Sequence, residues 1–142
     1  MKYHFKVRKD RPNGFWGECL ELKGCQTQGE TEEELLFNME EALNLYLDEP
    51  SDSKLIFPLP KEQKGRGIVA VPVQPRIAFA FLLRTARLKH HYTQRHTADL
   101  LGFKNISAYQ KLEKSKTANP GLETLVKVKR VFPEIQIDDI AS

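Results

Sequence analysis

Residues 93–113 read TQRHTADLLGFKNISAYQKLE, and their pattern is the strongest structural signal in the second half of the chain. Thr93 is suited to cap a short helix, which we expect from about Gln94 to Leu101, because its hydroxyl can accept a hydrogen bond from the first helical turn. Gly102 can adopt a positive φ and so reverse the chain. A second helix is expected from about Asn105 to Lys114. The stretch therefore predicts a helix-turn-helix.

Two more helices are expected on either side of this motif, from about Arg76 to Leu88 and from about Leu122 to Phe132. The charge of the chain changes in the same place. Residues 76–132 hold 12 Lys and Arg against 3 Asp and Glu, a net charge of +9. Residues 1–75 hold 10 against 13, a net charge of −3. This contrast is typical of a polyanion-binding module joined to a part with a different partner.

The first half of the chain has the pattern of a small sheet with one helix. Thr31 is suited to cap that helix, and Glu34 completes a capping box three residues later. The order of elements is β-β-β-α-β, with strands expected over residues 1–8, 15–22, 25–27 and 68–73. We therefore predict an α+β protein of two domains, residues 1–74 and 75–142, with the boundary near Gln74-Pro75.

Polar and basic side chains of the helix-turn-helix are candidates for contact with DNA. Ser107 and Gln110 point away from the expected core and can bond to base edges in the major groove. Gln94 lies at a helix N-terminus, where backbone N–H groups favour a phosphate. The predicted DNA-binding residues are Thr93, Gln94, Lys104, Asn105, Ser107, Gln110, Lys111 and Lys114.

Several short motifs of the second half occur in the order of a known family. TQ at Thr93, Ala98, LG at Leu101, LE at Leu112 and NPGLETL at Asn119 follow one another along the chain. This series resembles the Cro/repressor-type helix-turn-helix over roughly residues 76–132.

The first half resembles the HicB antitoxin family. Residues 14–47 read GFWGECLELKGCQTQGETEEELLFNMEEALNLYL, and "C.TQGET.EE" is the most specific piece of the resemblance. The stretch KNISAYQKLE, residues 104–113, is similar to the helix-turn-helix of longer HicB proteins. The resemblance implies a reduced RNase H-like fold for the first domain. It also implies an antitoxin that neutralises a HicA-type, mRNA-cleaving toxin and represses its own operon.

The expected helix from Arg76 to Leu88 carries apolar side chains nearly all round. A helix of this kind needs burial on more than one face. A two-fold partner on a palindromic operator would supply part of that burial, so we predict a homodimer or a higher oligomer. Ile135-Gln136-Ile137 alternates and is expected to add a strand across the two-fold axis.

Two other functions stay open on the residues alone. One is a transcriptional repressor that responds to a small ligand bound by the N-terminal sheet. The other is a degenerate RNase H-like nuclease, which would need carboxylates converging on two metals. The first expected strand carries no carboxylate. We therefore expect no enzymatic activity and no catalytic residue, and interpret the remaining acids as solvated or partner-facing: Asp10, Glu18, Glu21 and Glu40.

No metal site or cofactor is expected. Cys19 and Cys25 lack a Cys-x-x-Cys spacing and are interpreted as buried free thiols. His90, His91 and His96 are interpreted as a solvated or phosphate-facing cluster. The N-terminus is charged and the longest apolar run is short, so the sequence predicts a soluble protein of the reducing cytoplasm, without membrane contact.

Overall fold

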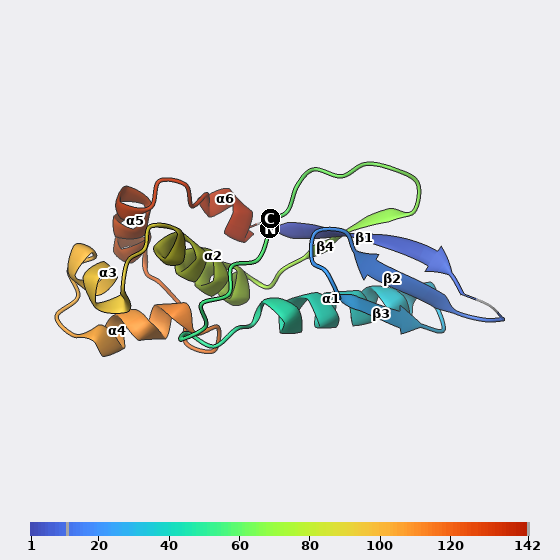
Figure 1. Cartoon of the computed structure of the whole chain (residues 1–142), viewed down its shortest axis with the longest axis horizontal. Coiled ribbons are helices and arrows are strands. Elements are labelled where there is room, and N and C mark those ends of the chain that lie inside the picture. Colours follow the sequence, from blue (N-terminus) through green and yellow to red (C-terminus); the bar gives the residue numbers. More distant parts are fainter. Residues whose placement is uncertain (11, 142) are drawn as a thin grey trace. The chain divides into compact units, whose positions relative to one another are not determined.

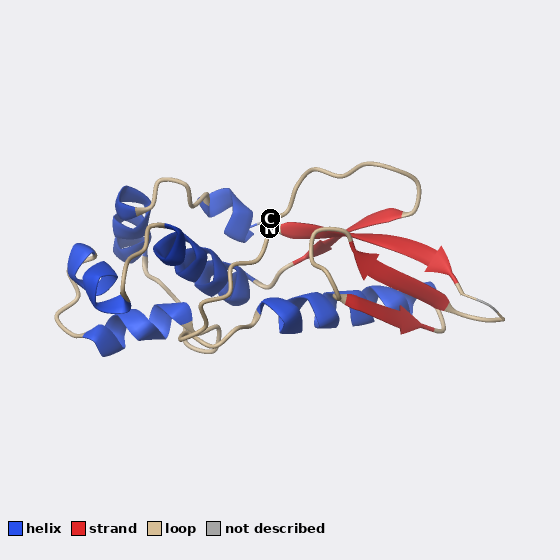
Figure 2. Ribbon diagram, in the orientation of Figure 1, coloured by secondary structure: helices blue, strands red, loops and turns tan. Residues whose placement is uncertain are grey.

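The computed structural model describes residues 1–10 and 12–141, so Arg11 and Ser142, which belong to the two predicted domains, lie outside the described part. The chain divides into two compact units. The first combines Met1–Leu47 with Phe57–Val73, and the second combines Asp48–Ile56 with Gln74–Ala141 (Figure 1). All the strands belong to the first unit, and the second unit is helical (Figure 2). The α+β class is therefore confirmed.

The first unit is built on a four-stranded antiparallel sheet with the strand order β3-β2-β1-β4. With the helix α1 between the third and fourth strands, the predicted order β-β-β-α-β is confirmed. The second strand ends earlier than predicted because the chain turns away after Cys19, with Gly24 at a φ of +84°. The strands are β1 (Lys2–Lys9), β2 (Phe15–Cys19), β3 (Gln26–Gly29) and β4 (Ile68–Pro72).

Helix α1 (Glu32–Leu47) packs along one face of this sheet. Strand β1 turns Tyr3 and Phe5 toward the core, and both are fully buried, as are Leu35, Met39 and Leu43 of α1. The cap predicted from the sequence is present, because the Thr31 hydroxyl accepts a bond of 3.1 Å from the backbone N–H of Glu34. The apolar side chains that alternate in β1 and recur at helical spacing in α1 thus form the core of this unit.

The second unit is a bundle of short helices. Its elements are α2 (Pro75–Lys89), α3 (Gln94–Leu100), α4 (Ile106–Gln110), a 3₁₀ turn η1 (Lys111–Glu113), α5 (Leu122–Val131) and α6 (Ile137–Ala141). No described helix combines the length and the hydrophobicity needed to span a bilayer.

The helix predicted from Asn105 to Lys114 is shorter than expected. It tightens into the 3₁₀ turn at Lys111, and Lys114 is already extended, with a φ of −108° and a ψ of 125°. The Thr117 hydroxyl donates to the carbonyl of Lys111 over 2.6 Å, and the carbonyl of Lys114 accepts from Thr117 N and Ala118 N. These local bonds satisfy the carbonyls that a longer helix would have used.

The strand expected at Ile135-Gln136-Ile137 is absent from the described chain, and a helix begins there instead. Ile135 is buried, and α6 starts at Ile137 with Asp138 and Asp139 in its first turn. Acidic side chains in the first turn favour a helix start. The alternation that predicted a strand was therefore too short to decide between the two structures.

Helix α2 is buried within the chain itself. Every residue from Ala78 to Arg87 is buried, on all sides of the helix. The apolar side chains around this helix are therefore buried without a second subunit, and they give no evidence for an oligomer. The oligomeric state stays a prediction that rests on the symmetry of operators alone.

Candidate nucleic-acid interface

Helices α3 and α4 are joined by a tight reversal of the chain. The Thr93 hydroxyl accepts from the backbone N–H of His96 over 3.0 Å and so caps α3. Gly102 has a φ of +79°, as its place in the turn predicts. The backbone N–H of Phe103 then donates to the carbonyl of Ala98, which holds the turn against α3. Local signals in the sequence therefore account for this helix-turn-helix.

The eight predicted DNA-binding residues differ in how far they reach the surface. Gln94 and Gln110 are half-buried. Thr93 caps α3, and the Asn105 side chain caps α4 by accepting from the backbone N–H of Ala108 over 2.9 Å. The exposed members of the set are Thr93, Lys104, Asn105, Ser107, Lys111 and Lys114.

Gln94 and Gln110 form a hydrogen-bonded pair that the sequence did not reveal. The Gln110 amide donates to the Gln94 side-chain oxygen over 3.0 Å. The Gln94 amide donates in turn to the backbone carbonyl of Ser51 over 3.2 Å and to Glu113 Oε1 over 3.3 Å. The expectation that Gln110 simply points outward is therefore wrong. The Gln110 amide is oriented by Gln94, whose own amide is held by Ser51 and Glu113.

Glu113 is the centre of the network below this pair and is fully buried. Arg87 donates two hydrogen bonds to the Glu113 carboxylate, from Nε over 2.7 Å and from Nη2 over 3.0 Å. The Tyr109 hydroxyl also donates to this carboxylate. Burial opposes the charge on Arg87, but the bond and the charge of Glu113 outweigh burial and raise the pKa of Arg87. Burial and the negative Glu113 raise the pKa of Tyr109.

Sequence reasoning missed this ion pair. Its one signal was the position of Glu113, directly after the apolar Leu112 and four residues after Tyr109 on the same helix face. The burial also reduces the basic surface of the second unit. Arg84 is 1% exposed and Arg87 is 6% exposed, so neither contributes to a surface that phosphates could reach.

Two of the three histidines of this region contact other side chains of the second unit. His90 Nε2 lies 2.7 Å from a carboxylate oxygen of Glu134, and its ring lies against Tyr92 and Phe132. His96 packs on the edge of Tyr92. All three histidines are exposed, which agrees with the interpretation of a solvated cluster, and the Glu134 carboxylate lies on the Nε2 side of the His90 ring. Throughout the described residues, no three His, Cys, Asp or Glu side chains gather as metal ligands.

Glu21 of the first unit is not the outward acid that the sequence suggested. Its side chain is 3% exposed. The turn after β2 folds it onto β1, where it accepts from the backbone N–H of His4 over 2.9 Å. His4 Nδ1 lies 2.7 Å from the same carboxylate. Cys19 and Cys25 are buried free thiols, as predicted.

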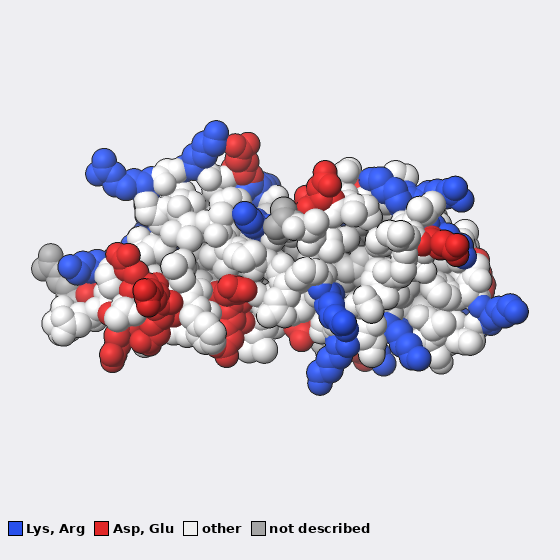
Figure 3. Space-filling model, turned by 180° about the vertical axis from the view of Figure 1, so that it is seen from behind, with Lys and Arg blue, Asp and Glu red and all other residues white. Residues whose placement is uncertain are grey.

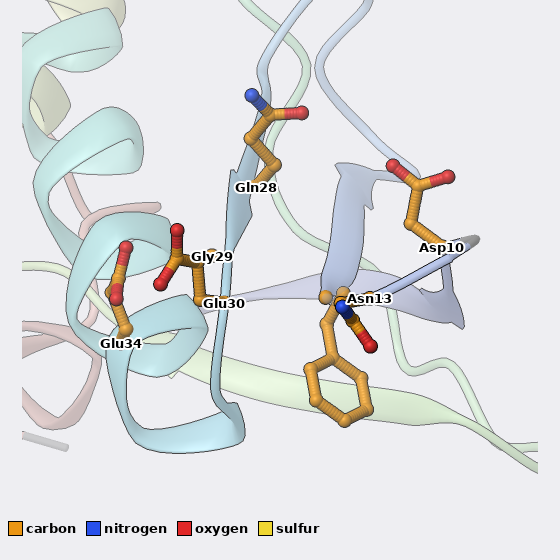
Figure 4. A pocket seen from close by; sticks show the side chains of 8 residues that line it. Asp10, Asn13, Gln28, Gly29, Glu30 and Glu34 are labelled. Atoms are coloured by element: carbon orange, nitrogen blue, oxygen red, sulfur yellow. The ribbon is translucent and has the colours of Figure 1, made fainter.

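A polar pocket of about 420 Å³ opens at one end of the first unit. Figure 4 shows the carboxylates of Glu30 and Glu34 on its α1 side and Asp10 across the opening. Small-molecule sites are mostly apolar with a few polar groups. Charged and amide side chains make up most of the residues that line this pocket, so it offers little support for a ligand sensor.

Comparison with known proteins gives one family match and several similar proteins. Residues 83–140 match the helix-turn-helix family, which confirms that prediction. The chain is similar to a UPF0150 protein of Helicobacter pylori, with 38% identity over 74 residues that cover 52% of this chain and 92% of the relative. It is also similar to the UPF0150 protein ssr1765 of Synechocystis sp., with 39% identity over 46 residues, 32% of this chain and 58% of that relative.

A second relative from Synechocystis sp., the UPF0150 protein ssr1258, is 35% identical over 49 residues, which cover 34% of this chain and 71% of the relative. The match to the Helicobacter pylori protein leaves almost none of that relative uncovered, yet it takes up about half of this chain. This chain is therefore longer than the Helicobacter pylori relative, and about half of it lies outside the matched region.

Proposed function

This chain belongs to the UPF0150 family, and we propose that it is an antitoxin that neutralises a HicA-type toxin and represses its own operon. HicB antitoxins are UPF0150 proteins, and residues 14–47 carry the HicB-like "C.TQGET.EE" pattern. The helix-turn-helix unit supports the second half of the proposal. The observation that carries most weight is the pairing of Gln94 with Gln110, because it presents an oriented amide at the exposed helix of such a motif.

In this proposal α4 enters the major groove of the operator. Ser107, which is exposed, and the amide of the half-buried Gln110, which Gln94 orients, bond to base edges. Lys104, Lys111 and Lys114 neutralise phosphates of the flanking backbone. The N-terminus of α3, with Thr93 and Gln94, holds a further phosphate. This contact uses backbone N–H groups, because the Gln94 side-chain amide donates to Ser51 and Glu113.

The first unit binds the toxin in this proposal. Residues 1–75 carry a net charge of −3, which complements a basic, RNA-seeking protein. We further propose that this unit acts by binding and not by catalysis. Of the four acids considered for nuclease chemistry, Glu21 is tied to His4 and so is withdrawn from any convergent metal site. The protein works in the cytoplasm, where the operon and mRNA are found.

A single co-expression experiment tests both halves. The full chain is expressed with the tagged HicA-type protein encoded beside its gene, purified through the tag, and then added to DNA from upstream of the operon. The proposal predicts that the chain is retained on the column and that the eluate shifts this DNA but not a random duplex of equal length. A ligand-responsive repressor would shift the DNA without retention by the toxin.

A further inference from the structure

We propose that the outer face of α1 is the docking surface for a basic partner protein. This face consists of Glu33, Leu36, Phe37, Glu40, Glu41 and Leu45. The inference rests on the proposed binding of a HicA-type toxin and assigns the surface that performs it.

Large apolar side chains are exposed on this face. Phe37 is 68% exposed and Leu45 is 75% exposed, although the buried Leu35 and Met39 already supply the contact of α1 with the sheet. Phe37, Glu41 and Leu45 are spaced at i, i+4 and i+8, so they form one row about 12 Å long. Exposed apolar side chains grouped in this way, with charged residues around them, mark interaction sites. The fold of the first unit does not explain them.

The charges around this row have one sign. Helix α1 contains no Lys or Arg, and its five glutamates are all exposed: Glu32, Glu33, Glu34, Glu40 and Glu41. Acidic side chains accordingly gather along the lower edge of the unit that contains α1 in Figure 3. The first three glutamates favour the helix N-terminus. Glu40 and Glu41 lie too far along the helix to do so, and within the described residues neither forms an ion pair.

The exposed apolar row and the surrounding glutamates of α1 indicate which kind of partner can bind this face. Nucleic acid is excluded, because the glutamates would repel its phosphates. A second copy of the chain, paired through the same face, would bring glutamates against glutamates. A protein with basic side chains around an apolar contact complements both features of the face. Such a partner is steered toward α1 by charge and held there by Phe37 and Leu45.

The experiment uses the full chain and the purified HicA-type protein encoded beside its gene. The affinity and association rate are measured by surface plasmon resonance for wild type, Phe37→Ser and the double variant Glu40→Lys/Glu41→Lys. Phe37→Ser is expected to weaken binding about tenfold or more. The double variant is expected to slow association about tenfold at low salt, with a smaller effect at high salt.

Two matched variants serve as controls. Glu62→Lys makes the same kind of charge change in a loop of the first unit, where the Glu62 side chain is 80% exposed. Leu122→Ser removes an apolar side chain that is 82% exposed on α5. Both are expected to bind the toxin within about twofold of wild type. Circular dichroism verifies that each variant is folded, which is expected because all the substituted side chains are exposed.

The possible outcomes separate the inference from the proposed function. If wild type binds the toxin and the α1 variants bind equally well, the docking surface is elsewhere and the inference is wrong, while the antitoxin proposal stands. If wild type fails to bind, both are wrong. If Phe37→Ser abolishes self-association in sedimentation without weakening toxin binding, the face joins two copies of the chain and the inference is overturned.

Discussion

The amide of Gln110 is the group on which the proposed reading of DNA most depends. Because Gln94 orients it, the amide loses little rotational freedom when it bonds to a base. We expect Gln110→Ala to cost about 1–3 kcal/mol on the operator and little on random DNA. Fluorescence anisotropy with both duplexes measures the two values. Equal losses on both duplexes would show that Gln110 contributes no sequence recognition.

Lys111 represents the second class of contact. Its side chain is exposed just beyond α4, where we expect it to neutralise a phosphate. Lys111→Ala is expected to weaken binding to the operator and to random DNA about equally, and to lower the dependence of log K on log salt by about 1. A titration across salt concentrations checks this. An unchanged slope would place Lys111 outside the interface.

Glu113 sets the stability of the second unit through its buried pair with Arg87. Glu113→Ala leaves the Arg87 guanidinium buried without its carboxylate, so we expect the free energy of unfolding to fall by about 3–5 kcal/mol. Glu134→Ala is the matched control, because it breaks the exposed pair with His90 and is expected to cost less than about 1 kcal/mol. Urea denaturation compares the two. Equal losses would mean that burial adds nothing to the effect.

At the scale of elements, two glycines determine how closely α1 approaches the sheet. A Cβ on Gly29 would lie 2.6 Å from the backbone N of Leu35 and 2.9 Å from its Cα. A Cβ on Gly17 would instead meet the flexible end of Met39, 2.6 Å from its sulfur. Gly29→Ala is therefore expected to destabilise the fold by about 3 kcal/mol or more, and Gly17→Ala by less, because Met39 can move. Thermal denaturation that ranks the two in reverse order would contradict this packing.

How much of these elements the sequence predicts depends on how local the signals are. Thr93 and Gly102 act on neighbouring residues, so the start of α3 and the turn after it were predicted closely. The tail at Ile135 offered only three alternating residues, too few to distinguish a strand from α6. The early end of α4 depended on Thr117, which reaches back to Lys111 from outside the expected helix.

The exposure of most candidate residues was predictable from the sequence, but the contacts between them were not. Six of the eight predicted side chains are exposed, as helical spacing suggested. The contact of Gln94 with Gln110 joins residues 16 positions apart, and the bond to Ser51 spans 43 positions. Periodicity carries no information about such pairs. A glutamate is normally interpreted as a surface residue, so the sequence pattern did not predict the burial of Glu113.

At the scale of the whole molecule, we expect a homodimer or a higher oligomer. A short helix such as α4 reads only a few base pairs, and a two-fold pair of such helices doubles the number. The symmetry of a palindromic operator requires such a pair. Analytical ultracentrifugation at micromolar concentration is expected to give at least twice the 16.4 kDa of the chain. A monomer under these conditions would contradict the expectation.

Size-exclusion chromatography of the chain with both partners is the decisive test of the antitoxin proposal. The chain is mixed with the HicA-type protein encoded beside its gene and with a labelled duplex from upstream of the operon. We expect one early peak that contains the chain, the toxin and the DNA, because separate units bind the two partners. A chain that elutes with the DNA but never with the toxin would contradict the claim that this helix-turn-helix protein is an antitoxin.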